Sequence, residues 1–420
     1  MDEQRLQEEV IQLREEIISA WSLAQLSDEK LHLMIDRLTR QKAERRGWSI
    51  RDASKIAEAV YAGVRGLEIL EELLRDDEVN EVMVNAYDCI FVERAGVIER
   101  SVKSFSSKER YEDIIQRIVS GSGREVHQRS PIVDCRLYDG SRVNVVLHPI
   151  AERGSCLTIR RFRKKRYSID DLVENGTLTE DAAGFLMRCV RARYNLFLSG
   201  GTGTGKTTFL NALTEAIPRE ERLITIEDAR ELDLPNRENW IALESRNANA
   251  FGEGEITIRQ LIRAALRMRP DRIIVGEVRG PEAIDMLQAL NTGHDGSIST
   301  GHANSILDMQ YRLETMVLSG NPGLPIEAVR QQIGSAIEIC VHLARLRDHR
   351  RRVVAIDEVL SEGADIVYYP LFRFREDATG ADGTPGSLVA CGELNHTAKL
   401  RSLSRFDSTP ALSQIQRRSS

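Results

Sequence analysis

The sequence has few aromatic residues and no long apolar run. Aromatic side chains make up 5% of its 420 residues, and no apolar run approaches the roughly 18 residues that a membrane-spanning helix needs. The first ten residues are acidic and polar, so we expect no secretory signal peptide. The six cysteines are scattered, without a CxxC pair, which argues against a zinc ribbon or a disulfide framework. This usage is typical of a reducing compartment, so we expect a cytoplasmic protein.

The chain also lacks a strong charge imbalance. It has 58 Lys and Arg residues against 64 Asp and Glu residues, a formal charge of −6, which argues against a dedicated nucleic-acid binder. Arginine nevertheless gathers in a stripe at helical spacing and in a second cluster: Arg259, Arg263 and Arg267 with Arg269 and Arg272, and Arg345, Arg347 and Arg350–Arg352. For the stripe, a solvated face and an interface with a subunit or an acidic partner remain equally open. The second cluster has no interleaved aromatic residues, which favours an anionic membrane surface or a membrane-protein loop over nucleic acid.

The length and the 41% hydrophobic content predict two or three globular domains. In residues 1–62, apolar residues recur at steps of three and four, as in Val10, Leu13 and Ile17, which predicts helices. In residues 63–165, the dipeptide Asp139-Gly140 between two strand-like runs predicts a hairpin. In residues 166–375, strand-like and helical runs alternate, which predicts βαβ units around a mainly parallel sheet. The expected organisation is a helical extension, an α+β domain, an α/β domain and a loosely structured tail, at residues 1–62, 63–165, 166–375 and 376–420.

The segment GGTGTGKT at 200–207 satisfies the phosphate-loop (Walker A) pattern GxxxxGK[ST]. It directly follows the apolar run NLFLS and precedes the helix-like run TTFLNALTEAI. The glycines let consecutive backbone amides turn toward phosphates, and the helix N-terminus adds the positive end of its dipole. We expect Lys206 to reach the β- and γ-phosphates of ATP and the Thr207 hydroxyl to ligate Mg²⁺. The predicted ATP-binding residues are Gly200, Gly201, Thr202, Gly203, Thr204, Gly205, Lys206, Thr207 and Thr208.

Two acidic motifs end strand-like runs beyond this loop. In RIIVGEVRG (272–280), an apolar strand delivers Glu277 to its carboxyl end, where the carboxylate could act as the general base for the attacking water. An ion pair with Arg279 is the structural alternative. In LITIED (223–228), Glu227 and Asp228 occupy an equivalent place and could hold Mg²⁺ or the water, or cap the next helix. Spacing alone leaves open which glutamate is the base.

Several motifs together resemble the secretion ATPases of the type II/type IV superfamily, and most of all the CpaF-like ATPases of Tad/Flp pilus assembly. The ATPase half carries the most specific ones, which are the Walker A loop, IEDARELDL (226–234), LIRAALRMRPDRIIVGEVRG (261–280), MLQALNTGHDGS (286–297) and GHANS (301–305). Upstream, the similar stretches are DDEVNEVMVN (76–85), SPIVDCRLYDGSRVN (130–144) and LTIRRF (157–162). The resemblance covers roughly residues 60–375. The tetracysteine insertion of the general type II secretion ATPases is missing, which disfavours that branch.

The resemblance implies a homo-hexameric ring whose N-terminal α+β domain covers nucleotide held by a RecA-like domain. It implies that Glu227 and Asp228 form the Asp box, that Glu277 is the Walker B glutamate, and that His302 is a γ-phosphate sensor. Arg142 and Arg160 match arginines that reach the γ-phosphate in relatives. The sequence departs from the family at Gly301, where relatives carry a bulkier apolar residue, and this predicts a looser surrounding of the histidine.

As a function, the resemblance implies an ATPase with Mg·ATP as its substrate. It would power pilus assembly or protein secretion through inner-membrane platform proteins, as a peripheral protein on the cytoplasmic face of that membrane. No nucleic-acid partner is expected. Three alternatives stay open: a conjugative type IV secretion ATPase, a nucleotide-dependent scaffold with little turnover, and a RecA-like nucleic-acid translocase.

Overall fold

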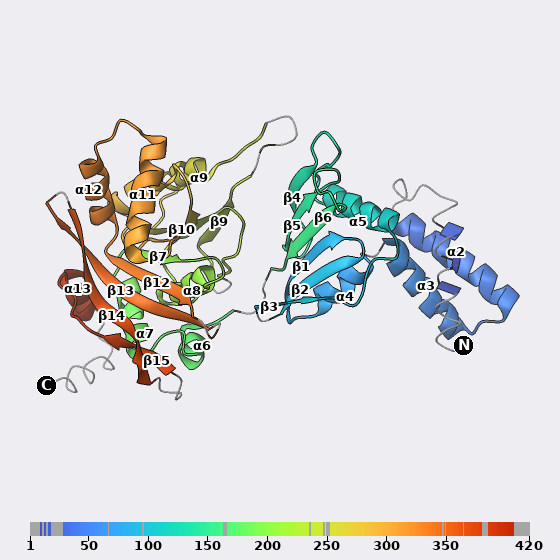
Figure 1. Ribbon diagram of the computed structural model, residues 1–420, viewed down its shortest axis with the longest axis horizontal. Helices are drawn as coiled ribbons and strands as arrows, with labels where there is room; N and C mark the ends of the chain where they lie inside the picture. Colours follow the sequence, from blue (N-terminus) through green and yellow to red (C-terminus); the bar gives the residue numbers. More distant parts are fainter. Residues whose placement is uncertain are drawn as a thin grey trace. The chain divides into compact units, whose positions relative to one another are not determined.

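The structure is a computed structural model, which describes residues 9–10, 12–13, 16–17, 28–65, 67–94, 96–162, 166–234, 237–246, 248, 253–346, 348, 350–363, 365–379 and 385–406. The chain divides into two compact units, residues 1–163 and 164–420, each with its own sheet (Figure 1). Within the described residues, no helix combines the length and the apolar character needed to cross a bilayer.

The first unit begins with helices that share a small core of their own. Helices α2 (Asp28–Arg46) and α3 (Ile50–Arg65) pack against each other. Leu13 and Ile17 of the predicted apolar stripe are buried with Ile35, Ile56 and Val60. The other predicted stripe residues before residue 28, apart from Val10, lie outside the described residues.

The remainder of this unit is an antiparallel sheet with two helices. In its described residues, six strands follow the order β3-β2-β1-β6-β5-β4. On β5 and β6, alternate residues such as Val143 and Ile159 are buried, because one sheet face packs against the helices while the other does not. The elements are α4 (Ile69–Arg75), β1 (Val79–Ala86), β2 (Cys89–Arg94), β3 (Val97–Arg100), α5 (Lys108–Gly121), β4 (Ile132–Arg136), β5 (Arg142–Val146) and β6 (Cys156–Arg160).

The second unit contains a nine-stranded sheet in its described residues, in the order β15-β14-β13-β12-β7-β11-β10-β8-β9. Strands β12 to β9 in this order are parallel, whereas β13, β14 and β15 are antiparallel to their neighbours. The strands are β7 (Leu196–Gly200), β8 (Leu223–Glu227), β9 (Trp240–Glu244), β10 (Arg272–Val278), β11 (Ile298–His302), β12 (Ile339–Arg345), β13 (Arg351–Glu362), β14 (Asp365–Thr379) and β15 (Pro385–Ala390).

Helices cover both faces of this sheet (Figure 1), so its central strands β7 and β8 are buried throughout and mainly apolar. One core layer includes side chains of α6, α7, α8 and α13, and the other those of α9, α10, α11 and α12. The helices are α6 (Ile169–Glu174), α7 (Glu180–Arg191), α8 (Lys206–Leu213), α9 (Ile258–Ala265), α10 (Ala283–Asn291), α11 (Ile306–Gly320), α12 (Ile326–Ala336) and α13 (Ala398–Phe406). The predicted parallel α/β sheet is confirmed.

The expectation of a loosely structured tail at 376–420 is wrong for much of its described part. The end of β14, strand β15 and helix α13 lie there. The buried carboxylate of Glu358 accepts hydrogen bonds from the backbone amides of Asn395 and His396, at 2.7 and 2.8 Å. The Gly-, Pro- and Ser-rich composition that suggested a loose tail falls around the connection between β14 and β15.

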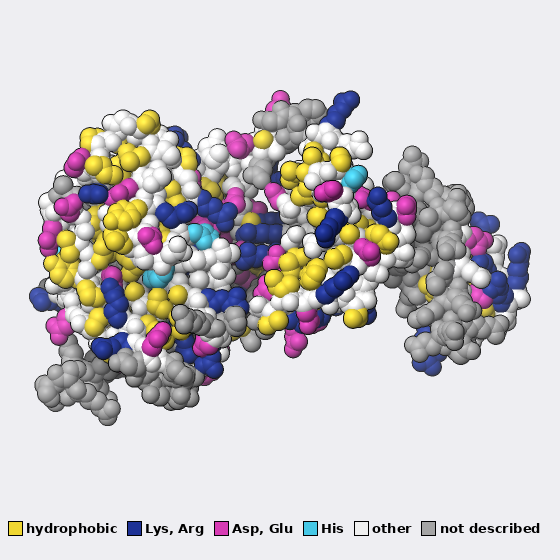
Figure 2. Space-filling model, in the orientation of Figure 1, with side chains coloured by type: hydrophobic (Ala, Val, Ile, Leu, Met, Phe, Trp, Pro, Cys, Tyr) yellow, Lys and Arg dark blue, Asp and Glu magenta, His cyan; other side chains and the backbone are white. Residues whose placement is uncertain are grey.

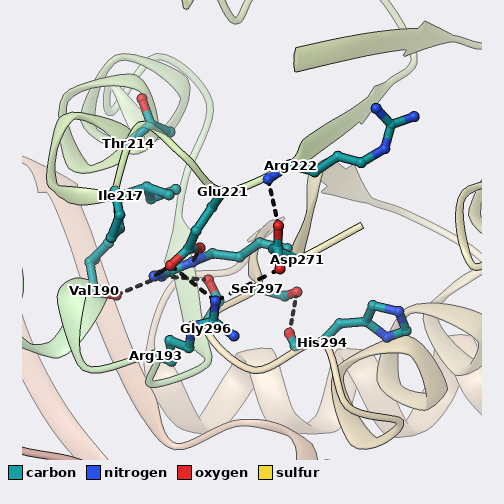
Figure 3. A network of polar contacts seen from close by, with 12 residues as sticks. Val190, Arg193, Thr214, Ile217, Glu221, Arg222, Asp271, His294, Gly296 and Ser297 are labelled. Carbon is teal, nitrogen blue, oxygen red and sulfur yellow. Dashed lines mark hydrogen bonds and ion pairs between the residues drawn. The ribbon is translucent and has the colours of Figure 1, made fainter. Parts of the chain in front are cut away.

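A buried ion-pair network fixes the amino ends of the parallel strands (Figure 3). Arg272, the first residue of β10, is fully buried, and its Nε and Nη2 lie 2.5 and 3.1 Å from the carboxylate oxygens of Glu221. Its Nη1 donates to the carbonyl of Val190 at 2.5 Å, and Arg193 lies 3.1 Å from the same glutamate. Arg272 is therefore an internal residue and no part of the exposed arginine stripe that the sequence suggested.

Candidate functional site

The phosphate loop connects strand β7 to helix α8. All residues of β7 are buried, and α8 begins at Lys206. Gly203 and Gly205 adopt φ values of 72° and 92°, which glycine reaches without the steric cost of a side chain. The hydroxyl of Thr204 donates to the carbonyl of Gly201 at 2.9 Å and closes the loop on itself. The predicted residues 200–208 thus lie at the end of β7, in the loop after it and in the first turn of α8, the arrangement that presents backbone amides to phosphates.

Lys206 connects this loop to the neighbouring strand β11. Its Nζ donates to the carbonyls of Gly200 and Gly201, at 3.0 Å each, and lies 3.3 Å from Nδ1 of His302. An ammonium group only donates hydrogen bonds, so Nδ1 must be the acceptor and the proton of the neutral imidazole lies on Nε2. Burial, followed by the charge of Lys206, lowers the pKa of His302, which favours this neutral form.

The Nε2 of His302 lies close to the predicted general base. It lies 2.7 Å from one carboxylate oxygen of Glu277, on strand β10 next to β11. The other oxygen accepts from Arg279 at 2.8 Å, so the ion pair that we named as the structural alternative exists alongside the contact with the histidine. Lys206, His302 and Glu277 therefore form one continuous set of contacts at the carboxyl edge of the sheet. His294, the other histidine near β11, precedes the strand at its opposite end.

The two acidic residues at the end of β8 have different surroundings. Glu227 is buried, and its Oε1 accepts from the backbone amides of Glu231 and Leu232 at 2.9 and 3.0 Å. Asp228 is half-exposed, accepts from Ser245 Oγ at 2.7 Å, and lies 3.8 Å from Arg279. Glu227 thus holds the loop that follows it. Asp228 presents its carboxylate near Arg279, which also contacts Glu277.

Gly301 is packed closely, contrary to the looser surrounding predicted for His302. A Cβ added at this position would lie 2.8 Å from Sδ of Met309 and 3.1 Å from Cζ of Phe197. Both side chains belong to the buried core. The space beside Gly301 is therefore filled by side chains of α11 and β7.

Arg142 and Arg160 lie directly opposite each other on the adjacent strands β5 and β6 of the first unit. Arg136 on β4 faces Arg142 in the same register, so three arginines form a row across three strands. The sequence did not indicate Arg136, because a two-residue turn at Asp139-Gly140 would place Val143 opposite it, whereas the observed register places Arg142 there.

The two arginine clusters are only partly exposed, because some of their members bind within the chain. Arg259 and Arg263 both contact the buried carboxylate of Asp285 on α10, at 2.7 and 2.8 Å. These two arginines therefore bind within the chain. In the second cluster, Arg352 is buried against Gly176, where an added Cβ would lie 2.0 Å from its Nη1, whereas Arg351 lies against the phosphate loop. Arg347 lies outside the described residues.

Figure 2 shows Lys and Arg side chains, with histidine among them, on the face of the second unit that is turned toward the viewer. Acidic side chains lie among them on this face (Figure 2).

Comparisons with known proteins agree with this geometry. The family profile described as "Type II/IV secretion system protein" matches residues 64–397. A "putative conjugal transfer protein" of Mycobacterium tuberculosis is 39% identical over 297 residues, which cover 69% of this chain and 84% of that protein. The "Type IV secretion system protein VirB11" of Brucella suis is 32% identical over 303 residues, covering 66% and 84% of the two chains.

Among solved structures, the pilus retraction motor PilT with bound ADP matches 81% of this chain and 87% of its own, with a TM-score of 0.52 and 20% sequence identity. At this identity the likeness shows the fold alone, which is RecA-like, as expected. The expected superfamily of secretion ATPases is confirmed, and the CpaF-like branch within it stays a prediction. The match over most of the sequence, which includes the phosphate loop, Glu277 and His302, places the chain in the type II/IV secretion system protein family.

Proposed function

We propose that this chain hydrolyses ATP and uses the energy to drive assembly of a Tad/Flp-type pilus, or a related secretion process, through an inner-membrane platform. The observation that carries the catalytic half is the set of contacts from Lys206 through His302 to Glu277. It joins a phosphate-binding cation, a group that can sense the γ-phosphate and a carboxylate base at one edge of the sheet. The transport half rests on the resemblance to CpaF-like ATPases.

In the proposed reaction, ATP lies along the backbone amides of the phosphate loop. Lys206 exchanges its contacts with the Gly200 and Gly201 carbonyls for the β- and γ-phosphate oxygens. A hydroxyl and a carboxylate are suitable ligands for a hard cation, so Thr207 and Asp228 would hold Mg²⁺. When bound, Mg²⁺ would neutralise charge on the phosphates.

Glu277 then accepts a proton from the water that attacks the γ-phosphorus, and the bond from that phosphorus to the oxygen of ADP breaks. ADP and inorganic phosphate are the products. Glu277 suits the role of base better than Glu227, because Glu277 belongs to the set of contacts with His302 and Lys206. Glu227 instead accepts the backbone amides of the loop that follows it. Departure of the γ-phosphate would also remove the partner of His302 and let its contact with Lys206 form again.

The first unit contributes arginines to this scheme. Arg142 and Arg160 lie opposite each other on one sheet, so both guanidinium groups could approach one phosphate and stabilise its developing charge. We propose that they act in this way within a homo-hexameric ring. Their support is the family resemblance together with the shared register.

A conjugative type IV secretion ATPase is the second candidate. It is favoured by relatives whose names describe conjugal transfer, at 39% identity for the mycobacterial protein. It shares the enzymatic half of the proposal and differs in the partner. A scaffold with little turnover is less favoured, because such a protein would be expected to have lost the lysine or the base.

Hydrolysis is tested by measuring phosphate release from ATP in the presence of Mg²⁺. We expect turnover in the wild type and a loss of at least about a hundredfold in Glu277→Gln, because typical general-base contributions are about 10²–10⁴-fold. Lys206→Ala should also lose turnover, because it removes the cation that contacts the β- and γ-phosphates. Lys108→Ala and Glu327→Gln, on exposed residues of α5 and α12, are matched controls and should remain active. Retained turnover in Glu277→Gln would contradict the assignment of the base.

The partner is tested separately. The Glu277→Gln protein would be purified with ATP from gently solubilised native membranes, and the bound proteins identified by mass spectrometry. Polytopic platform proteins with small prepilin-like subunits would support the pilus motor. Components of a conjugation channel would instead support the second candidate.

A further inference from the structure

We infer that Arg351 is a positioning residue of the nucleotide site, which acts through the peptide bond between Gly203 and Thr204 in the phosphate loop. This inference rests on the proposed function, because it assigns a further residue to the ATP site. Arg351 belongs to the second arginine cluster, for which the sequence suggested a membrane or membrane-protein partner.

Strands β12 and β13 bring Arg351 to the loop. Strand β12 runs parallel to β7 with Leu343 opposite Gly200, and β13 returns antiparallel with Arg351 opposite Arg345. The end of β12 lies close to the loop, since a Cβ added at Gly200 would lie 2.5 Å from the carbonyl oxygen of Leu343. A Cβ added at Gly205 would lie 3.3 Å from Cδ of Arg351. The arginine side chain therefore lies directly against the phosphate loop.

The decisive contact is a hydrogen bond from Nε of Arg351 to the carbonyl oxygen of Gly203, at 2.8 Å. In a planar trans peptide, the carbonyl and the following N–H point in opposite directions. The N–H of Thr204 therefore points away from Arg351. A phosphate loop needs such amides turned toward the phosphates, so the arginine holds one amide in its binding orientation.

The charge of Arg351 adds to this geometric effect. A guanidinium group forms stronger hydrogen bonds than a neutral donor does, and it polarises the peptide whose carbonyl it contacts. Polarisation makes the N–H of the same peptide a better donor. The positive charge also lies against the phosphate loop, where it favours the binding of an anion to that loop. Both effects raise the affinity for nucleotides that carry a β-phosphate.

The test is the dissociation constant of MgADP, measured by calorimetry on the full chain. Arg351→Met removes the donor and the charge, Arg351→Gln keeps a donor without charge, and Arg351→Lys keeps both. We expect Arg351→Met to weaken binding about tenfold, equivalent to about 1.4 kcal/mol. Arg351→Lys should recover most of this loss and Arg351→Gln less. Arg350→Met, on an exposed arginine 3.8 Å from Asp348, is the matched control and should bind like the wild type.

Two further measurements distinguish a positioning role of Arg351 from a general loss of structure in the variant. The midpoint of thermal unfolding without nucleotide should be the same in Arg351→Met and in Arg350→Met. Binding of adenosine, which has no phosphate, should be equal in both. Wild-type affinity of Arg351→Met for MgADP would overturn the inference and leave the proposed function intact. Failure of the wild type itself to bind MgADP would overturn both.

Discussion

At the residue scale, the ammonium group of Lys206 determines how its neighbours share their protons. It can only donate, so Nδ1 of His302 must accept, and the proton lies on Nε2, which is 2.7 Å from a carboxylate oxygen of Glu277. The sequence predicted all three residues as parts of the site. It could not predict their order of contact, because that order depends on β10 and β11 lying side by side.

His342 provides a test of burial at the same scale. It is buried on β12, its Nδ1 lies 2.8 Å from Oγ of Ser199, and burial lowers its pKa. The unfolded chain therefore binds a proton at this position at a higher pH than the native state does. The contribution of neutral His342 to the unfolding free energy is therefore fully present above the unfolded pKa of about 6.5. It is lost as the pH falls below that value.

We expect His342→Gln to reduce the pH dependence of the unfolding free energy between about pH 7 and pH 5, a range that spans the unfolded pKa of about 6.5. Urea denaturation of both proteins across this range measures the effect. His148→Gln, on an exposed histidine, is the control and should keep the wild-type slope. Equal slopes for His342→Gln and the wild type would show that His342 does not titrate differently in the native state.

At the element scale, the buried pair of Arg272 and Glu221 joins the first residue of β10 to the segment just before β8. Removing one partner leaves the other charge buried without compensation, which typically costs about 3–5 kcal/mol. We therefore expect Glu221→Ala to lower the unfolding free energy of the second unit by about this amount. Calorimetric unfolding measures it, and Glu220→Ala on the exposed neighbouring residue is the control.

Helix α13 is a second element whose removal can be tested. Lys399 contacts the carbonyl of Arg193 at 3.0 Å and the carboxylate of Glu338 at 2.7 Å, and Tyr194 donates to the carbonyl of His396 at 2.5 Å. A chain that ends at Cys391 loses these contacts and leaves the buried carboxylate of Glu358 without two of its donors. We expect its thermal midpoint to fall by several degrees.

The control for this truncation is a chain that ends at Phe406, which retains α13. Since buried acceptors that lose their donors cost about 1–3 kcal/mol, the difference between the two chains should be readily measured. Equal midpoints would mean that α13 contributes nothing to the second unit.

At the scale of the whole molecule, the two units have separate cores, and the phosphate loop belongs to the second. A ligand that binds only the native state stabilises it according to its concentration, by about 2.7 kcal/mol at one hundred times its dissociation constant. We expect MgADP at that excess to raise the unfolding free energy of the 164–420 unit by this amount. In Lys206→Ala this increase should be lost. Differential scanning calorimetry measures this, and equal stabilisation of Lys206→Ala would contradict it.

The sequence alone determined the phosphate loop, the strand-end carboxylates and the parallel sheet around them. Each depends on local pattern: glycine spacing, apolar runs and the alternation of strands with helices. Only the tertiary structure decided which contacts these residues make. It placed Arg351 against the loop and Arg272 in the core, although both read as exposed arginines, and it formed β15 and α13 in an apparently loose tail. Such roles depend on residues far apart in the chain, because burial and pairing are set by the packing of whole strands and helices.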